Sequence, residues 1–261
     1  MKRIFVLLSL ACAVLTMSAQ TLERVSPESV GMDAQRLANA DAAIEQAIQK
    51  KNIPGAVLAV VRHGKMAYIK AYGNKRVDPK NEPMTIETVF DMASCSKAMS
   101  TAVCAMTLIE QGKIRLQDRV SDYIPGYEGW TDEKGNKTAI RIIDLMTHTS
   151  GLPAYADANM LKEKYGAPNR DGLIDYIAHC KRNFKPGTDM TYSCLNFITL
   201  QRIIETVSGD DLRTYAHKHV FDVLGMKNTD YNPSKEMAKR CAPTEKQANG
   251  KCLLGYVHDP L

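Results

Sequence analysis

Residues 94 to 111 constrain the fold of this 261-residue chain more than any other segment, because they are apolar on nearly every side of a helix. Gly112 follows directly and is typical of a helix C-terminus. A helix that lacks a polar face has to be buried, so the rest of the chain must supply elements that cover it. The apolar positions are Met99, Ala102, Val103, Met106, Leu108 and Ile109.

Other periodic segments indicate a mixed helical and β fold. Residues 33 to 50 repeat apolar side chains at helical spacing and end before Pro54, which predicts a helix that docks on a neighbouring layer. Its apolar face consists of Leu37, Ala40, Ala43, Ile44 and Ile48. Two β-like runs follow, at 55 to 62 and 66 to 72, separated by the turn residues His63, Gly64 and Lys65. Further helices are expected at 139 to 147, 171 to 181, 195 to 207 and 210 to 224.

Only short β-like pieces remain near the end of the chain, at 239 to 244 and 252 to 258. A lone hairpin is marginal in water, and a stable sheet generally has three or more strands with one face covered. Either these last pieces complete the sheet, or part of the fold is absent from the chain. The pattern as a whole predicts the α+β class, with an antiparallel sheet flanked by helices and a separate helical region.

The first nineteen residues have the pattern of a secretory signal peptide. Lys2 and Arg3 precede an apolar run, and the small residues before Gln20 are typical of a cleavage site. The mature domain is therefore expected to comprise residues 20 to 261, in a periplasmic or secreted location. A membrane anchor needs about 20 continuous apolar residues, more than this segment provides. A lipoprotein signal ending at Cys12 is the less favoured alternative, because the apolar run continues past it.

Charge and cysteine content exclude some classes of partner and restrict the covalent chemistry. Without Lys2 and Arg3 the chain has 32 basic and 29 acidic residues and no block of like charge, so nucleic acid is not expected as a partner. Cys95, Cys104, Cys180 and Cys194 lie in expected helices, where free buried thiols are favoured. Cys241 and Cys252 flank a polar turn and are the one pair that a hairpin could join by a disulfide.

Ser94 and Lys97 form an S-x-x-K pattern at the start of the apolar helix. Residues three apart lie on the same helical face, so the amine can reach the hydroxyl. A serine attacks only when a base takes its proton, and a lysine can be that base when its pKa is lowered. Burial and the positive end of the helix dipole both act in that direction, and free N–H groups at the helix start can stabilise an oxyanion. We therefore expect a neutral amine at Lys97.

The histidines offer weaker alternatives. The chain has no G-x-S-x-G motif, so His258 and Asp259 have no serine with which to form a triad. His217 and His219 are two apart on an expected helix and do not share a face, which disfavours zinc binding. His148 is expected to hydrogen bond within a turn.

Four segments, in order along the chain, resemble the motifs of one known family. Phe90–Lys97 resembles the nucleophile motif of class C β-lactamases and related penicillin-binding proteins, esterases and peptidases. Leu145–Pro153, L-M-T-H-T-S-G-L-P, is similar to that family's L-L-T-H-T-S-G-L-P loop. Tyr192-Ser193-Cys194 resembles its Y-x-N motif, and Leu224–Thr229 its L-G-M-x-x-T segment.

The resemblance implies a β-lactamase/transpeptidase-like fold and a serine hydrolase that forms an acyl-enzyme. Ser94 would be the nucleophile, Lys97 the general base, and Tyr192 the phenol that shares their proton network. The substrate would be an ester, a cell-wall-type peptide or a β-lactam, and the family chemistry requires no metal or organic cofactor. The resemblance leaves the oligomeric state open.

Two departures from the family pattern bear on activity. Cys194 stands where many relatives have an asparagine that binds substrate, and a thiol is a weaker hydrogen-bonding group. The change either shifts preference away from β-lactams and towards esters or unusual peptides, or has no effect. The family's third motif, K-T-G or H-x-G, does not occur after Tyr192, so the domain is expected to be incomplete at its C-terminus. The alternative function is a non-catalytic penicillin- or peptidoglycan-binding protein, or an inactive homologue.

Overall fold

The computed structural model describes residues 22–166 and 169–257. The expected signal peptide and the His258-Asp259 pair lie outside these residues. None of the described helices has the length and apolar character needed to cross a membrane.

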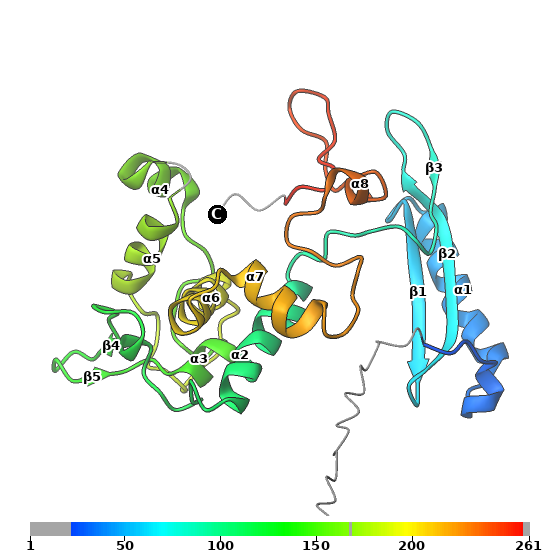
Figure 1. Ribbon diagram of the computed structural model, residues 1–261. Coiled ribbons are helices and arrows are strands. Elements are labelled where there is room, and N and C mark those ends of the chain that lie inside the picture. The colour runs from blue at the N-terminus through cyan, green and yellow to red at the C-terminus, as the bar shows by residue number, and fades with distance from the viewer. Residues whose placement is uncertain (1–21, 167–168, 258–261) are drawn as a thin grey trace, which may run out of the picture.

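The sheet has three antiparallel strands in the order β1-β2-β3, formed by Gly55–Arg62, Lys65–Arg76 and Glu82–Pro83. Strands β1 and β2 form the expected hairpin, and β2 extends four residues beyond its predicted end. His63 and Gly64 turn the chain with positive φ values of 51° and 70°, as a tight hairpin turn requires. Strand β1 forms one edge of the sheet (Figure 1).

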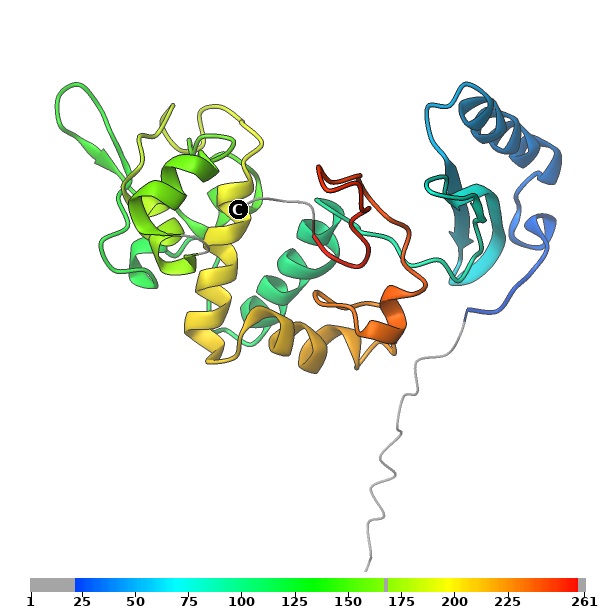
Figure 2. The same cartoon turned by 90° about the horizontal axis from the view of Figure 1, so that it is seen from above.

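Helix α1, Ala34–Gln49, packs against β2, and the two views show it covering one face of the sheet (Figures 1 and 2). Asp33 caps its start by accepting hydrogen bonds from two backbone N–H groups. The predicted apolar face is only partly right, because Ala43 is exposed and Asp41 lies on the docked side. Asp41 accepts hydrogen bonds from Tyr68, Tyr72 and Lys70 of β2, so polar contacts contribute to docking.

The helical region comprises several short helices around one core. Helix α6 confirms the prediction at 195 to 207, while the predicted 210 to 224 helix is a short α-helix continued by a π-helix. Helices α4 and α8 and the ribbon β4-β5 were not predicted. The elements are η1 Pro27–Val30, η2 Lys97–Thr101, α2 Ala102–Glu110, η3 Val120–Asp122, β4 Trp130–Thr131, β5 Lys137–Thr138, α3 Ile142–Met146, α4 Ala158–Tyr165, α5 Arg170–His179, α6 Cys194–Ser208, α7 Leu212–Ala216, η4 His217–Phe221 and α8 Lys235–Ala238.

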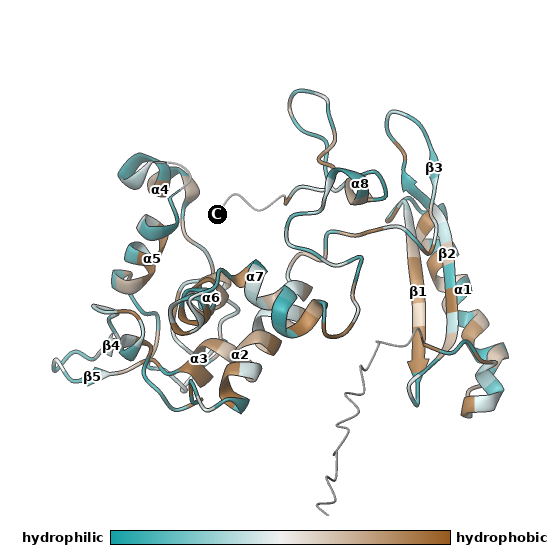
Figure 3. Cartoon of the chain, in the orientation of Figure 1, coloured by the Kyte–Doolittle hydropathy of each residue, from teal (hydrophilic) through white to brown (hydrophobic). Residues whose placement is uncertain are grey.

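The core of this region lies between α2, α3, α5, α6 and α7. Leu108, Leu145, Ile177 and Leu200 are all fully buried there, one from each of the first four helices. Figure 3 shows apolar residues on α2, α3 and α6, and also on strand β1 of the sheet. The prediction that the helix at 94 to 111 is buried on all sides is wrong. Met106 of α2 is 58% exposed, and Met99 in the preceding turn is 48% exposed.

The segment after η4 lies between the sheet and the helical region in both views (Figures 1 and 2). Of the two alternatives left open for its β-like pieces, completion of the sheet is not observed: Cys241 forms an isolated parallel bridge with Val89, and Cys252 pairs with Lys246. Because those partners differ, Cys241 and Cys252 are not opposite each other, and both are free thiols. Cys104 and Cys194 are buried as predicted, whereas Cys95 is exposed.

Candidate active site

The backbone just before Ser94 is held in a strained turn. The Asp91 carboxylate accepts a hydrogen bond of 2.8 Å from the Ala93 N–H, and Ala93 has a φ of 43°, uncommon for a residue with a side chain. The carbonyl groups of Met92 and Ala93 then accept from the N–H groups of Cys95 and Ser96. This turn leaves Ser94 exposed at the start of the helix. Strained backbone of this kind persists where the surroundings impose it, often at functional sites.

Lys97 begins a π-helical turn, in which the Ala102 N–H donates to the Lys97 carbonyl oxygen. Its Nζ donates a hydrogen bond of 3.0 Å to Ser94 Oγ, so the predicted contact between nucleophile and amine is present. Ser100 and Thr101 of the same turn are buried. The wide turn therefore sits between an exposed nucleophile and the core.

A second segment, almost a hundred residues later, supplies the other two predicted site residues. Lys97 Nζ lies 5.3 Å from the centre of the Tyr192 ring. Cys194 is the first residue of α6, is 6% exposed and lies close enough to Lys97 to raise the pKa of its amine. Ser94, Lys97, Tyr192 and Cys194 thus form one cluster between the starts of two helical segments.

The electrostatics of Lys97 differ from the expectation. Burial lowers its pKa, but hydrogen bonds and charge interactions with Tyr192 and Cys194 raise it more, so the net direction is upward. Lys97 is therefore an ammonium at neutral pH, and the prediction of an amine kept neutral by its surroundings is wrong. The physical reason is the pair of acidic groups from the 192–194 segment, which favour the charged form.

One backbone donor remains free next to the nucleophile. The N–H groups of Cys95 and Ser96 are used within the turn, whereas the Ser94 N–H has no hydrogen-bonding partner among the described residues. That group can donate to a negatively charged oxygen formed on an acyl group bound to Ser94.

The loop Leu145–Pro153 supports the Tyr192 segment. His148 Nδ1 lies 3.2 Å from the Ser193 backbone nitrogen, and its carbonyl oxygen accepts from the Thr191 N–H. The His148 ring was expected to hydrogen bond within its own turn, but its contacts instead reach the separate 191–196 segment. Asn196, which sequence reasoning missed, lies 3.1 Å from the same ring nitrogen and is fully buried. The signal that would have found it is an amide on the buried face of α6, since buried polar groups are almost always hydrogen bonded.

The other histidines that the structure describes have partners of their own. His217 Nδ1 lies 3.0 Å from Asp222, and His219 packs on the Tyr215 ring. In residues 22–166 and 169–257, no group of three or more histidine, cysteine or carboxylate side chains is arranged to hold a metal ion.

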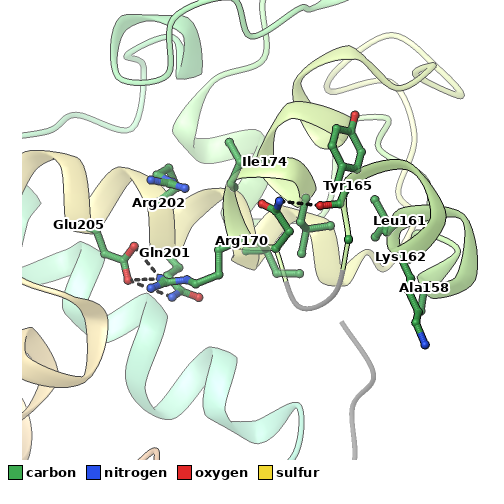
Figure 4. Close-up of a pocket in the computed structure, with 13 residues that line it drawn as sticks. Ala158, Leu161, Lys162, Tyr165, Arg170, Ile174, Gln201, Arg202 and Glu205 are labelled. Carbon is green, nitrogen blue, oxygen red and sulfur yellow. Dashed lines mark hydrogen bonds and ion pairs between the residues drawn. The ribbon is translucent and has the colours of Figure 1, made fainter.

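A cavity of about 310 Å³ between α4, α5 and α6 is separate from this cluster (Figure 4). None of the four predicted site residues lines it. Its most buried charge, Glu205, is already paired with Arg170 at 2.7 Å and accepts a hydrogen bond from Gln201. The cavity therefore offers no unpaired buried polar group that would orient a ligand.

The chain belongs to the Beta-lactamase family, whose model matches residues 40–255. It is 31% identical to an N-acetylmuramyl-L-alanine amidase of Bacillus subtilis (strain 168) over 90% of this chain and 58% of that protein. It is 29% identical to a putative D-alanyl-D-alanine carboxypeptidase of Escherichia coli (strain K12) over 97% of this chain and 60% of that protein. The chain thus spans less than two thirds of the length of these relatives.

Among solved structures, the chain resembles EstCE1, a hydrolase with promiscuous acyltransferase activity. The TM-score is 0.70 with 28% sequence identity, over 84% of this chain and 59% of that one. The predicted β-lactamase/transpeptidase-like fold of the α+β class is therefore confirmed.

Proposed function

We propose that residues 20–261 form a serine hydrolase domain that acts through an acyl-enzyme on Ser94. The observation that carries this proposal is the 3.0 Å contact between Lys97 Nζ and Ser94 Oγ, with the centre of the Tyr192 ring 5.3 Å from the same amine. Family membership and the relatives named as amidase, carboxypeptidase and hydrolase support it.

In this proposal Lys97 and Tyr192 act as a pair, because Lys97 alone is protonated at rest. The reactive form has one proton fewer on the pair, either as ammonium and phenolate or as amine and phenol. Ser94 Oγ adds to the acyl carbon as its proton passes to the basic member of the pair, the Lys97 amine or the Tyr192 phenolate, and the carbonyl oxygen becomes an oxyanion facing the Ser94 N–H. The pair then returns the proton to the leaving group, which departs as the acyl-enzyme forms. Water adds to the acyl-enzyme by the same steps and releases the acid.

The substrate class follows from Cys194, whose thiol contacts Lys97 and is a weak partner for an amide. We propose esters as the preferred substrates, with cell-wall-type peptides and β-lactams as poorer ones. Hydrolysis needs no metal or organic cofactor in this scheme. The pattern of residues 1–19 and the names of the two curated relatives support action outside the cytoplasm.

The alternative is a protein that binds acyl compounds without turnover. It is favoured by the raised pKa of Lys97, because an ammonium group cannot take the proton of Ser94.

Labelling with a fluorescent fluorophosphonate tests the proposal, read out as the second-order rate of label attached to Ser94. Ser94→Ala should take no label, and Lys97→Met should be labelled about 10²-fold more slowly, the usual contribution of a general base. Lys113→Met, at an exposed lysine beyond the end of α2, is the matched control and should keep the wild-type rate. A folded wild-type chain that takes no label contradicts the proposal. Stable label from a fluorescent penicillin, without hydrolysis of any chromogenic ester, favours the alternative.

A further inference from the structure

The ring of His148 lies directly against Tyr192. The two ring centres are 4.5 Å apart, with an angle of 38° between the ring planes. The Phe197 ring packs on the same imidazole at 5.3 Å. His148 is half-buried, whereas Tyr192 is 42% exposed. The imidazole therefore packs against one face of a phenol ring that is partly exposed to solvent.

The hydrogen bonds of His148 define its protonation. A backbone N–H can only donate, so the Ser193 N–H requires Nδ1 of His148 to be an acceptor. Asn196 Nδ2 must then donate to the same nitrogen, and the single proton of the neutral ring lies on Nε2. Burial and the nearby charge of Lys97 lower the pKa of His148, which is consistent with a neutral ring.

The orientation of Asn196 is fixed in turn by Ser150. The Ser150 hydroxyl donates a hydrogen bond of 2.6 Å to Asn196 Oδ1 and accepts one from the Leu152 N–H. Ser150 is 1% exposed and Asn196 is 0% exposed, so leaving either without its partner would cost about 1–3 kcal/mol. Buried hydrogen bonds of Ser150 and Asn196 therefore fix the position of the imidazole.

Backbone contacts extend this hold to both neighbours of Tyr192. The His148 carbonyl oxygen accepts from the Thr191 N–H, and its ring accepts from the Ser193 N–H. His148 itself has a φ of 59°, a left-handed conformation that a residue with a side chain adopts at a cost of about 1–3 kcal/mol. His148 thus contacts Tyr192 through its ring and hydrogen bonds to the residues on either side, Thr191 and Ser193.

We propose that His148 is a positioning residue for Tyr192, which it holds towards Lys97 by ring packing and by fixing the backbone on either side. The inference rests on the proposed function, because it assigns His148 a role only through the Lys97–Tyr192 pair. A displacement of about 1 Å at such a group can lower the rate about 10²-fold.

The test compares labelling of Ser94 by fluorophosphonate in wild-type and Tyr192→Phe backgrounds. His148→Ala should slow labelling about tenfold or more in the wild-type background and less than about twofold in Tyr192→Phe, where the phenol that it positions no longer exchanges a proton. His148→Asn is the second variant: asparagine tolerates a positive φ and keeps an acceptor for the Ser193 N–H, so it should fold and recover part of the rate.

His63→Ala is the control, since His63 is another histidine with a positive φ but lies in the exposed β1-β2 turn. It should leave labelling unchanged. Equal slowing by His148→Ala in both backgrounds overturns the inference and leaves the proposed function standing. A wild-type chain without label, or a Tyr192→Phe variant labelled at the wild-type rate, overturns the proposed proton pair and the inference with it.

Discussion

The Tyr231 hydroxyl donates a hydrogen bond of 2.8 Å to Ser100 Oγ and lies 3.5 Å from Thr101 Oγ1, so it contacts the π-helical turn that starts with Lys97. Asp230, the residue before it, binds Arg213 through two contacts of 2.7 Å. The segment after η4 therefore connects the helical core to the turn that aims Lys97 at Ser94.

Replacement of Tyr231 by phenylalanine should destabilise the protein and slow the labelling of Ser94. The change removes a hydrogen bond to the buried Ser100, so the free energy of unfolding in urea should fall by about 1 kcal/mol. Tyr256→Phe is the control, because Tyr256 is 71% exposed, and it should change neither quantity. Unchanged stability of Tyr231→Phe would show that this contact does not hold the turn.

Two glycines with the same backbone angle distinguish the cost of backbone strain from that of a steric clash: Gly151 in the Leu145–Pro153 loop and Gly187, shortly before Tyr192. Gly151 and Gly187 both have a φ of 79°, but a Cβ on Gly151 would collide with the Phe184 carbonyl oxygen, whereas one on Gly187 would meet nothing. Gly187→Ala should lose about 1 kcal/mol of stability from strain alone. Gly151→Ala should lose at least about 1 kcal/mol more by chemical denaturation, since backbone has to move. Equal losses of stability in the two variants would show that the backbone around Gly151 shifts without cost and that the clash with Phe184 has no effect.

His217 should make stability depend on pH. A hydrogen bond to the Asp222 carboxylate, with further contributions from Asp230, raises the pKa of His217 against the opposing effect of burial. The folded state therefore binds a proton that the unfolded state loses near pH 6.5, about the ordinary histidine value. Its contribution is complete below that pH and is lost as the pH rises through the raised pKa. The difference in unfolding free energy between wild type and His217→Gln should follow this course. Asp222→Asn should abolish most of the difference, and a difference independent of pH would contradict the assignment.

Asp41 should control the docking of α1 on the sheet. Hydrogen bonds from Lys70, Tyr68 and Tyr72 lower its pKa from 3.8 to about 2, so its contribution is present above 3.8 and is lost as the pH falls through about 2. Asp41→Asn should accelerate hydrogen exchange of the α1 amides at neutral pH, and the difference from wild type should shrink across that acidic range. Glu45→Gln is the control, because the Glu45 carboxylate lies 3.9 Å from Lys70 Nζ and contributes little. The α1 amides of this variant should exchange at the wild-type rate.

The sequence alone determined the elements whose signals are local. Period-two and helical patterns located β1, β2, α1 and α6, and the S-x-x-K spacing put Lys97 within reach of Ser94, because each pattern depends on a few neighbouring residues. Short elements such as α4 and β3 were missed, since a few residues carry too little periodicity to stand out.

The tertiary structure decided what depends on residues far apart in the chain. It placed Tyr192 and Cys194 beside Lys97 and thereby reversed the expected direction of the Lys97 pKa. It separated Cys241 from Cys252 by pairing each with another partner, and it joined His148 to Asn196 through hydrogen bonds across 48 residues. The reason is physical: charge interactions and buried hydrogen bonds act over a few ångströms in space, and only the folded chain fixes which groups share that space.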